Sequence, residues 1–174
     1  MKKIVLASIL IAGSLLADSD YNFFTKRGVA PVENAFYKSE CASCHFAYQP
    51  GLLPAKSWTK VMGDLSNHFG TDASLEAVDN KTILEYLVDN SAEKFTNYKR
   101  SRKIVASIAE NETPIAVTAT GYFKQKHRGI PRRAIEQEEV KSLANCVACH
   151  TTAEKGSYSE RDIMIPNFGR WDDD

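Results

Sequence analysis

The apolar residues of this chain recur mostly at helical spacing, in short stretches that turn residues separate. Between Trp58 and Phe69 they follow one another at steps of three and four, which predicts an amphipathic helix over residues 55–69 that Gly70 ends. Weaker patterns predict irregular or weakly helical chain over 91–103 and an extended segment over 115–120. Further short helices are predicted over residues 34–41, 79–90, 121–128 and 136–143. The pattern therefore predicts a mainly α fold with short helices and long irregular segments.

The N-terminus has the composition of a signal peptide. Lys2 and Lys3 precede an apolar run over 4–16, and the small residue Ala17 offers a cleavage point. The run is too short for a permanent membrane span, although an uncleaved anchor remains an alternative. We therefore expect a signal peptide over residues 1–17 and an exported domain over 18–174. A break at 111–114 suggests two lobes, about 18–110 and 111–174.

One pentapeptide pattern, C-x-x-C-H, occurs twice in the chain. We call residues 41–45 the first motif and residues 146–150 the second motif. This pattern is the attachment signature of c-type haem: both thiols add to the porphyrin vinyl groups, and the histidine supplies an axial nitrogen to the iron. The predicted thioether residues are Cys41, Cys44, Cys146 and Cys149, and the predicted motif ligands are His45 and His150. The two motifs predict two covalently bound haem c groups, around which the short helices and irregular segments pack.

Two other uses of these cysteines are possible. In an exported chain the four cysteines could form two disulfides. C-x-x-C pairs with nearby histidines could instead hold zinc, although such sites are usual in reducing compartments. The double C-x-x-C-H pattern favours haem over both.

The chain has four histidines, and the motifs use two of them. The other two, His68 and His127, lie on predicted short helices and provide one further axial ligand for each iron. His68 follows the first motif histidine by 23 residues, and His127 precedes the second by 23. We predict that His68 serves the haem of the first motif and His127 that of the second, although the spacing also allows the crossed arrangement. Met62 and Met164 are rival ligands, and Met164 is the more serious of the two.

The charge balance excludes some partner classes. The chain has 22 basic and 22 acidic residues and contains no basic block, so nucleic acid and anionic lipid are poor candidates. Arg128, Arg132, Arg133 and Lys56 are candidates to pair with haem propionates, or they simply form a solvated basic surface.

The chain resembles the dihaem cytochrome c family. The resemblance rests on the first motif with the run Tyr-Gln-Pro-Gly-Leu-Leu-Pro-Ala-Lys-Ser-Trp over 48–58, on residues 68–75, and on the second motif with 144–145; it resumes near 126–127 and ends around 163–166. It implies a periplasmic electron-transfer protein with two low-spin haems, whose distal ligands would be His68 and His127. It also implies two redox partners, a small oxygen-binding c-type cytochrome and a membrane cytochrome b.

The histidine count bears on the function as well. Two imidazoles saturate an iron, which suits electron transfer and leaves no open position for a substrate. We therefore expect an electron relay and not an enzyme. The alternative is a dihaem enzyme of the peroxidase kind, in which one distal histidine is displaced; a haem-based sensor is a third option, and the chain has no signalling domain to support it.

Overall fold

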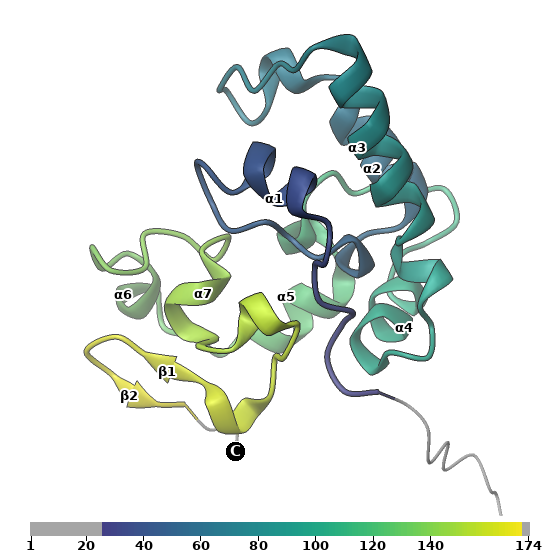
Figure 1. Cartoon of the computed structure of the whole chain (residues 1–174). Coiled ribbons are helices and arrows are strands. Elements are labelled where there is room, and N and C mark those ends of the chain that lie inside the picture. The colour runs from purple at the N-terminus through teal and green to yellow at the C-terminus, as the bar shows by residue number, and fades with distance from the viewer. Residues whose placement is uncertain (1–25, 172–174) are drawn as a thin grey trace, which may run out of the picture.

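A computed structural model describes residues 26–171, so the predicted signal peptide over 1–17 lies outside the described residues. The described chain is mostly helical, with single-turn 3₁₀ helices and irregular segments between the α-helices (Figure 1). The α-helices are α1 (Ala35–Cys41), α2 (Ala55–Met62), α3 (Ala77–Asp89), α4 (Lys99–Ala106), α5 (Gly121–His127), α6 (Arg132–Ile135) and α7 (Cys146–Cys149). The 3₁₀ helices are η1 (Pro50–Leu52), η2 (Leu65–Asn67), η3 (Ala92–Lys94), η4 (Val117–Ala119), η5 (Ala153–Lys155) and η6 (Glu160–Asp162). The predicted fold, with short helices and long irregular segments, is confirmed.

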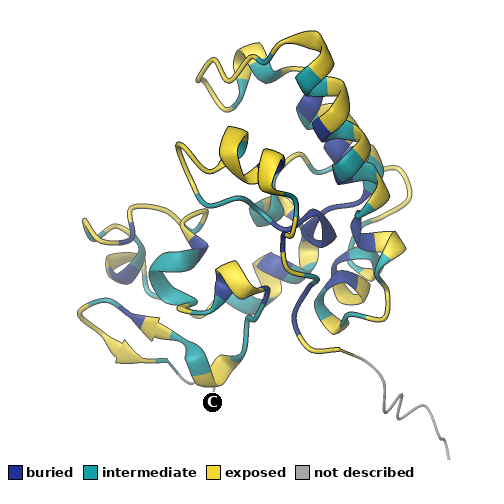
Figure 2. Cartoon of the chain, viewed as in Figure 1, coloured by how far each residue is buried: buried dark blue, intermediate teal, exposed yellow. Residues whose placement is uncertain are grey.

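The main core lies between α2 and α3, which pack side by side at one end of the molecule (Figure 1). Ile83 and Leu87 on α3 are almost completely buried, and Trp58 and Met62 on α2 meet them. The Trp58 indole Nε1 donates a hydrogen bond of 2.8 Å to the carbonyl of Pro50, so the polar end of this buried side chain is satisfied. Figure 2 shows the buried positions gathered where the two helices face each other and in the middle of the molecule. The apolar stripe of this helix pair thus forms a core without any cofactor.

A two-stranded antiparallel hairpin near the C-terminus was not predicted. β1 (Met164–Ile165) pairs with β2 (Gly169–Arg170), with Met164 opposite Arg170 and Ile165 opposite Gly169. Strands of two residues carry too few positions for an alternating pattern to be seen in the sequence. The hairpin packs on α7, and its buried residue Ile165 faces the second motif.

Several helix predictions are confirmed, and the capping chemistry explains them. α1 begins after Asn34, whose Oδ1 accepts a hydrogen bond of 2.8 Å from the Tyr37 amide. α5 begins after Thr120, whose hydroxyl accepts a bond from the Phe123 amide. The predicted helix over 79–90 corresponds to α3.

Other helix predictions are wrong. The helix predicted over 55–69 ends at Met62, because Gly63 caps it and Asp64 leaves the helical region with φ −142°. Residues 136–143 form turns instead of a helix, and Lys141 has a positive φ of 64° that interrupts any helix there. The segment 115–120, predicted to be extended, contains η4. The segment 91–103, predicted to be irregular or weakly helical, contains η3 and most of α4.

Contacts cross the predicted boundary between the two lobes. The Val29 amide donates a hydrogen bond of 2.9 Å to the carbonyl of Gly156. At this crossing Gly28 has φ +75°, and a Cβ there would lie 2.0 Å from the Gly156 oxygen, so the position requires glycine. The division into two lobes stays a prediction. Among residues 26–171, no helix combines the length and the apolar character needed to cross a bilayer.

Candidate haem-binding sites

The first motif begins on the last residue of α1 and continues as turns. Cys41 is half-buried, whereas Cys44 and His45 are exposed. The His45 Nδ1 lies 2.8 Å from the carbonyl oxygen of Phe46. A proton on Nδ1 satisfies that carbonyl and leaves the lone pair on Nε2, which is the arrangement of a metal-ligating histidine.

His68 faces the first motif, but it does not lie on a helix as predicted. It follows η2 and opens a tight turn in which its amide donates to the Thr71 carbonyl at 2.8 Å. The two central residues, Phe69 and Gly70, have φ of +52° and +87°, as in a type I′ turn. This turn places the His68 ring 6.2 Å from the His45 ring, with the planes 27° apart. Burial and the neighbouring His45 lower the pKa of His68, so its imidazole is neutral at neutral pH.

The second motif is one helical turn, α7, followed by His150. Cys146 is buried, and burial raises the pKa of its thiol to about 11. His150 follows the turn, and burial together with the nearby His127 and Arg100 lowers the pKa of His150 to about 4. The surroundings of this motif therefore favour an uncharged Cys146 thiol and a neutral His150 imidazole. The neutral imidazole is the form of histidine that ligates metal ions.

His127 is the last residue of α5 and faces the second motif. Its ring stacks on Phe123 at a centroid distance of 3.8 Å, and its Nδ1 lies 2.9 Å from the Phe123 carbonyl oxygen. The His127 and His150 ring centroids lie 6.0 Å apart, with the planes 74° apart. α5 thus orients the His127 ring by stacking and by one backbone contact.

A large cavity surrounds the second motif and a smaller one adjoins His68. The larger cavity has a volume of about 1050 Å³, part of it open to solvent. Its wall comes from α4, α5, α7, β1 and the irregular segments between them, and most of it is apolar. The smaller cavity, about 400 Å³, is lined by residues of α2 and of the His68 turn together with Ile115. The second motif therefore lies in a large, mostly apolar cavity with Cys146 buried, whereas Cys44 and His45 of the first motif are exposed.

Comparison with known proteins identifies the family. Residues 37–158 match the dihaem cytochrome c family. The chain belongs to the dihaem cytochrome c family. A comparison with curated protein sequences found no significant match.

Solved structures agree with this assignment. The X-ray structure of a dihaem cytochrome type c from Shewanella baltica OS155 is 38% identical, with a TM-score of 0.65, over 80% of this chain and 98% of that one. A dihaem cytochrome c from Rhodobacter sphaeroides is 38% identical, with a TM-score of 0.67, over 75% of this chain and 100% of that one. The dihaem cytochrome is thus an electron-transfer haem protein whose cofactors are two haem c groups.

The described residues fit these cofactors. Each motif presents two cysteines and a histidine, and no disulfide joins any of the four cysteines, all of which lie in the described chain. The apolar cavity at the second motif suits a porphyrin, and burial lowers the pKa of His150 within it. Within residues 26–171, no three His, Cys, Asp or Glu side chains form a group that could hold a metal ion by themselves.

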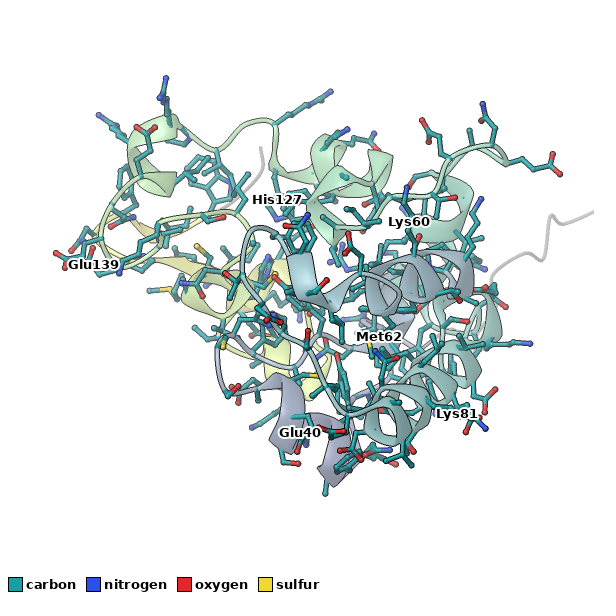
Figure 3. The ribbon with its side chains drawn as sticks, turned by 90° about the horizontal axis from the view of Figure 1, so that it is seen from above. Glu40, Lys60, Met62, Lys81, His127 and Glu139 are labelled. Carbon is teal, nitrogen blue, oxygen red and sulfur yellow. The ribbon has the colours of Figure 1, made fainter. Side chains whose placement is uncertain are left out.

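Met62 and Met164, the alternative axial ligands, lie outside the two cavities near the motifs. Met62 is 6% exposed and belongs to the core between α2 and α3, where Figure 3 shows it in the interior. Met164 is 49% exposed on β1. Neither side chain lines either cavity, so both are placed less well than His68 and His127 to reach an iron.

The basic residues singled out in the sequence do not line the cavities. Arg132 pairs with Glu136 at 2.6 Å, Arg133 lies over the Phe168 ring, and Lys56 donates to a backbone carbonyl. Arg100 and Lys126 line the larger cavity, around the second motif, and neither was among the basic residues predicted to pair with propionates. No local motif marks these two residues, because α4 and α5 bring them to the site only in the folded chain.

Proposed function

We propose that this dihaem cytochrome is a periplasmic electron relay in which both irons have two histidine ligands. His45 and His68 would ligate the haem of the first motif, and His150 and His127 that of the second. The observation that carries this proposal is the spacing of the two ring pairs, 6.2 Å and 6.0 Å between centroids. An imidazole nitrogen binds a metal ion at about 2 Å, so two imidazoles on opposite sides of one ion have centroids about 6 Å apart.

The residues around each pair support a relay. When bound, each haem supplies a one-electron ferric–ferrous couple at a potential that the axial ligands and the surroundings set. His127 and His68 occupy the positions from which a substrate would have to displace a ligand, and the stack of His127 on Phe123 opposes that displacement. For partners we propose an oxygen-binding c-type cytochrome and a membrane cytochrome b, one on each side of the relay. The signal-peptide pattern over residues 1–17 supports a periplasmic location.

Absorption and electron paramagnetic resonance spectra of the purified holoprotein test the proposal. We expect two six-coordinate low-spin haems in the oxidised protein, and a reduced protein that does not bind carbon monoxide. Mixing with hydrogen peroxide should give no turnover. A high-spin haem, carbon monoxide binding at one haem, or peroxide turnover would instead support the dihaem enzyme.

Arg100 should raise the potential of the second haem. Its guanidinium lines the larger cavity, around the second motif. It donates hydrogen bonds to the Tyr122 hydroxyl and to the Tyr158 carbonyl, the latter at 2.5 Å. A fixed positive charge stabilises ferrous over ferric iron, because the ferrous site carries one positive charge less. We expect Arg100→Gln to lower one midpoint potential by about 50–100 mV, the effect of a unit charge at roughly 10 Å in a medium of effective dielectric constant about 20.

A spectroelectrochemical titration measures both midpoint potentials in the Arg100 variant. Arg102→Gln is the matched control, because Arg102 lies on the same helix and is exposed. Solvent and salt screen an exposed charge, so this control should change both potentials much less. An equal shift in both variants would show that Arg100 acts only through the overall charge.

A further inference from the structure

Gln49 joins the segment after the first motif to the segment after the second. It is completely buried, although glutamine is usually exposed. Its Nε2 donates a hydrogen bond of 2.6 Å to the Ala153 carbonyl, and its Oε1 accepts one of 2.6 Å from the Tyr158 hydroxyl. The Tyr158 ring in turn meets the His150 ring edge-on, with centroids 5.3 Å apart. Both ends of the buried amide are therefore used to hold chain that directly follows the second motif.

The neighbouring Tyr48 makes a second connection. Its ring lies 5.1 Å from the His45 ring and 4.5 Å from Phe46. Its hydroxyl donates a hydrogen bond of 2.5 Å to the Ala144 carbonyl, two residues before Cys146. One side chain thus touches the ligand of the first motif and binds the backbone that leads into the second.

Together these bonds attach the chain after the first motif to both flanks of the second. Tyr48 binds the chain before the second motif, and Gln49 binds the chain after it through Ala153 and Tyr158. Tyr48 itself is held in place, because the Tyr37 hydroxyl donates to its carbonyl at 2.8 Å. A site whose supporting residues are locked by such bonds keeps its geometry within narrow limits.

We propose that Tyr48, Gln49 and Tyr158 form a tether that sets the distance and orientation of the two haems relative to each other. The three residues are positioning residues: they act through the motifs that they connect. The relative placement of two haems determines how strongly the charge on one iron changes the potential of the other, and how fast electrons pass between them. The inference rests on the two-haem relay proposed above, but it does not depend on which side chains are the distal ligands.

Circular dichroism in the Soret region of the holoprotein tests the tether. Two haems held close together give a paired positive and negative signal, whose intensity depends on their distance and mutual orientation. We expect Tyr48→Phe and Tyr158→Phe each to weaken this signal by roughly a quarter or more, because a site that loses its supporting bonds loosens by about 1 Å. The separation between the two midpoint potentials should change in the same variants.

Tyr86→Phe is the matched control. Tyr86 lies on α3, and its hydroxyl interacts with the backbone at Glu33 and Asn34, outside both motifs, so this substitution removes a polar contact but none of the bonds of the tether. This variant should keep the full Soret signal. If Tyr48→Phe does not fold, Tyr158→Phe alone decides the test. The tether is refuted if the folded tether variants match the control in both the Soret signal and the potential separation.

The absorption spectrum separates this inference from the proposed function. Each tether variant should keep two six-coordinate low-spin haems, because none of the substitutions removes a proposed ligand. A high-spin haem in the unmodified protein would contradict the proposed ligation while leaving the tether measurable. An unchanged Soret signal in variants with two low-spin haems would refute the tether and leave the relay intact.

Discussion

Replacing His68 by alanine is expected to leave both haems attached and to convert one of the two from low-spin to high-spin. Attachment should persist because it depends on Cys41 and Cys44, which the substitution does not change. The iron loses a ligand because the described residues that line the small cavity include no second histidine, methionine or cysteine, and the open turn admits water. Electron paramagnetic resonance should assign half of the iron to a high-spin species. The reduced variant should bind one carbon monoxide per protein.

Ser66→Ala is the control for this substitution. Ser66 is exposed in η2, two residues before His68, so its replacement perturbs the same segment without removing a proposed ligand. Both haems should stay low-spin in the control. Two low-spin haems in the His68 variant would mean that another residue is the distal ligand of the first haem.

The histidines show how much of the haem-binding sites can be predicted from the sequence alone. The two motifs identify their own cysteines and histidines, because C-x-x-C-H has a single dominant chemical use in an exported chain. The prediction that His68 and His127 are the distal ligands rests on counting ligands against irons, which does not depend on secondary structure. Their partners did not follow, since the spacing of 23 residues also allowed the crossed arrangement. The ring distances of 6.2 and 6.0 Å favour the uncrossed one.

The local structure around His68 was predicted less well. The apolar stripe from Trp58 to Phe69 has helical spacing throughout, yet the helix ends at Met62. Gly63 weakens the helix at one position, and the positive φ of Phe69 and Gly70 then turns the chain so that His68 faces the first motif. A bulky residue such as Phe69 rarely adopts positive φ, so a sequence pattern gives no warning of this turn.

The hydrogen bonds between residues far apart in the chain could not be predicted from the sequence, for a different reason. Gln49 bonds with residues more than 100 positions away, and Arg100 reaches Tyr158 across 58 positions. Gln49 lies in the run over 48–58 that resembles the family, and Arg100 lies in no motif, but nothing in the sequence around either residue indicates a role at the second site. Their importance arises from the packing of irregular segments around two cofactors, where no repeat of helix or strand restricts which residues meet.

Removing the second haem is expected to destabilise the protein much more than removing the first. Replacing both cysteines and the histidine of the second motif by alanine abolishes attachment and leaves the cavity of about 1050 Å³ without its occupant. The walls of that cavity come from α4, α5, α7 and β1, which would lose their shared apolar contact. We expect a loss of several kcal/mol, a large part of the roughly 5–15 kcal/mol that stabilises a typical domain.

The matched variant makes the same three substitutions in the first motif. It also loses one haem, as mass spectrometry of the denatured protein will show, but it should unfold at a denaturant concentration closer to that of the unmodified protein. The first site lies at the surface, and the core of α2 and α3 is packed by its own side chains, with Ile83 and Leu87 each 1% exposed. Urea unfolding followed by far-ultraviolet circular dichroism compares the two variants directly. Equal destabilisation would mean that the first haem contributes as much to the folded state as the second, in spite of its open site.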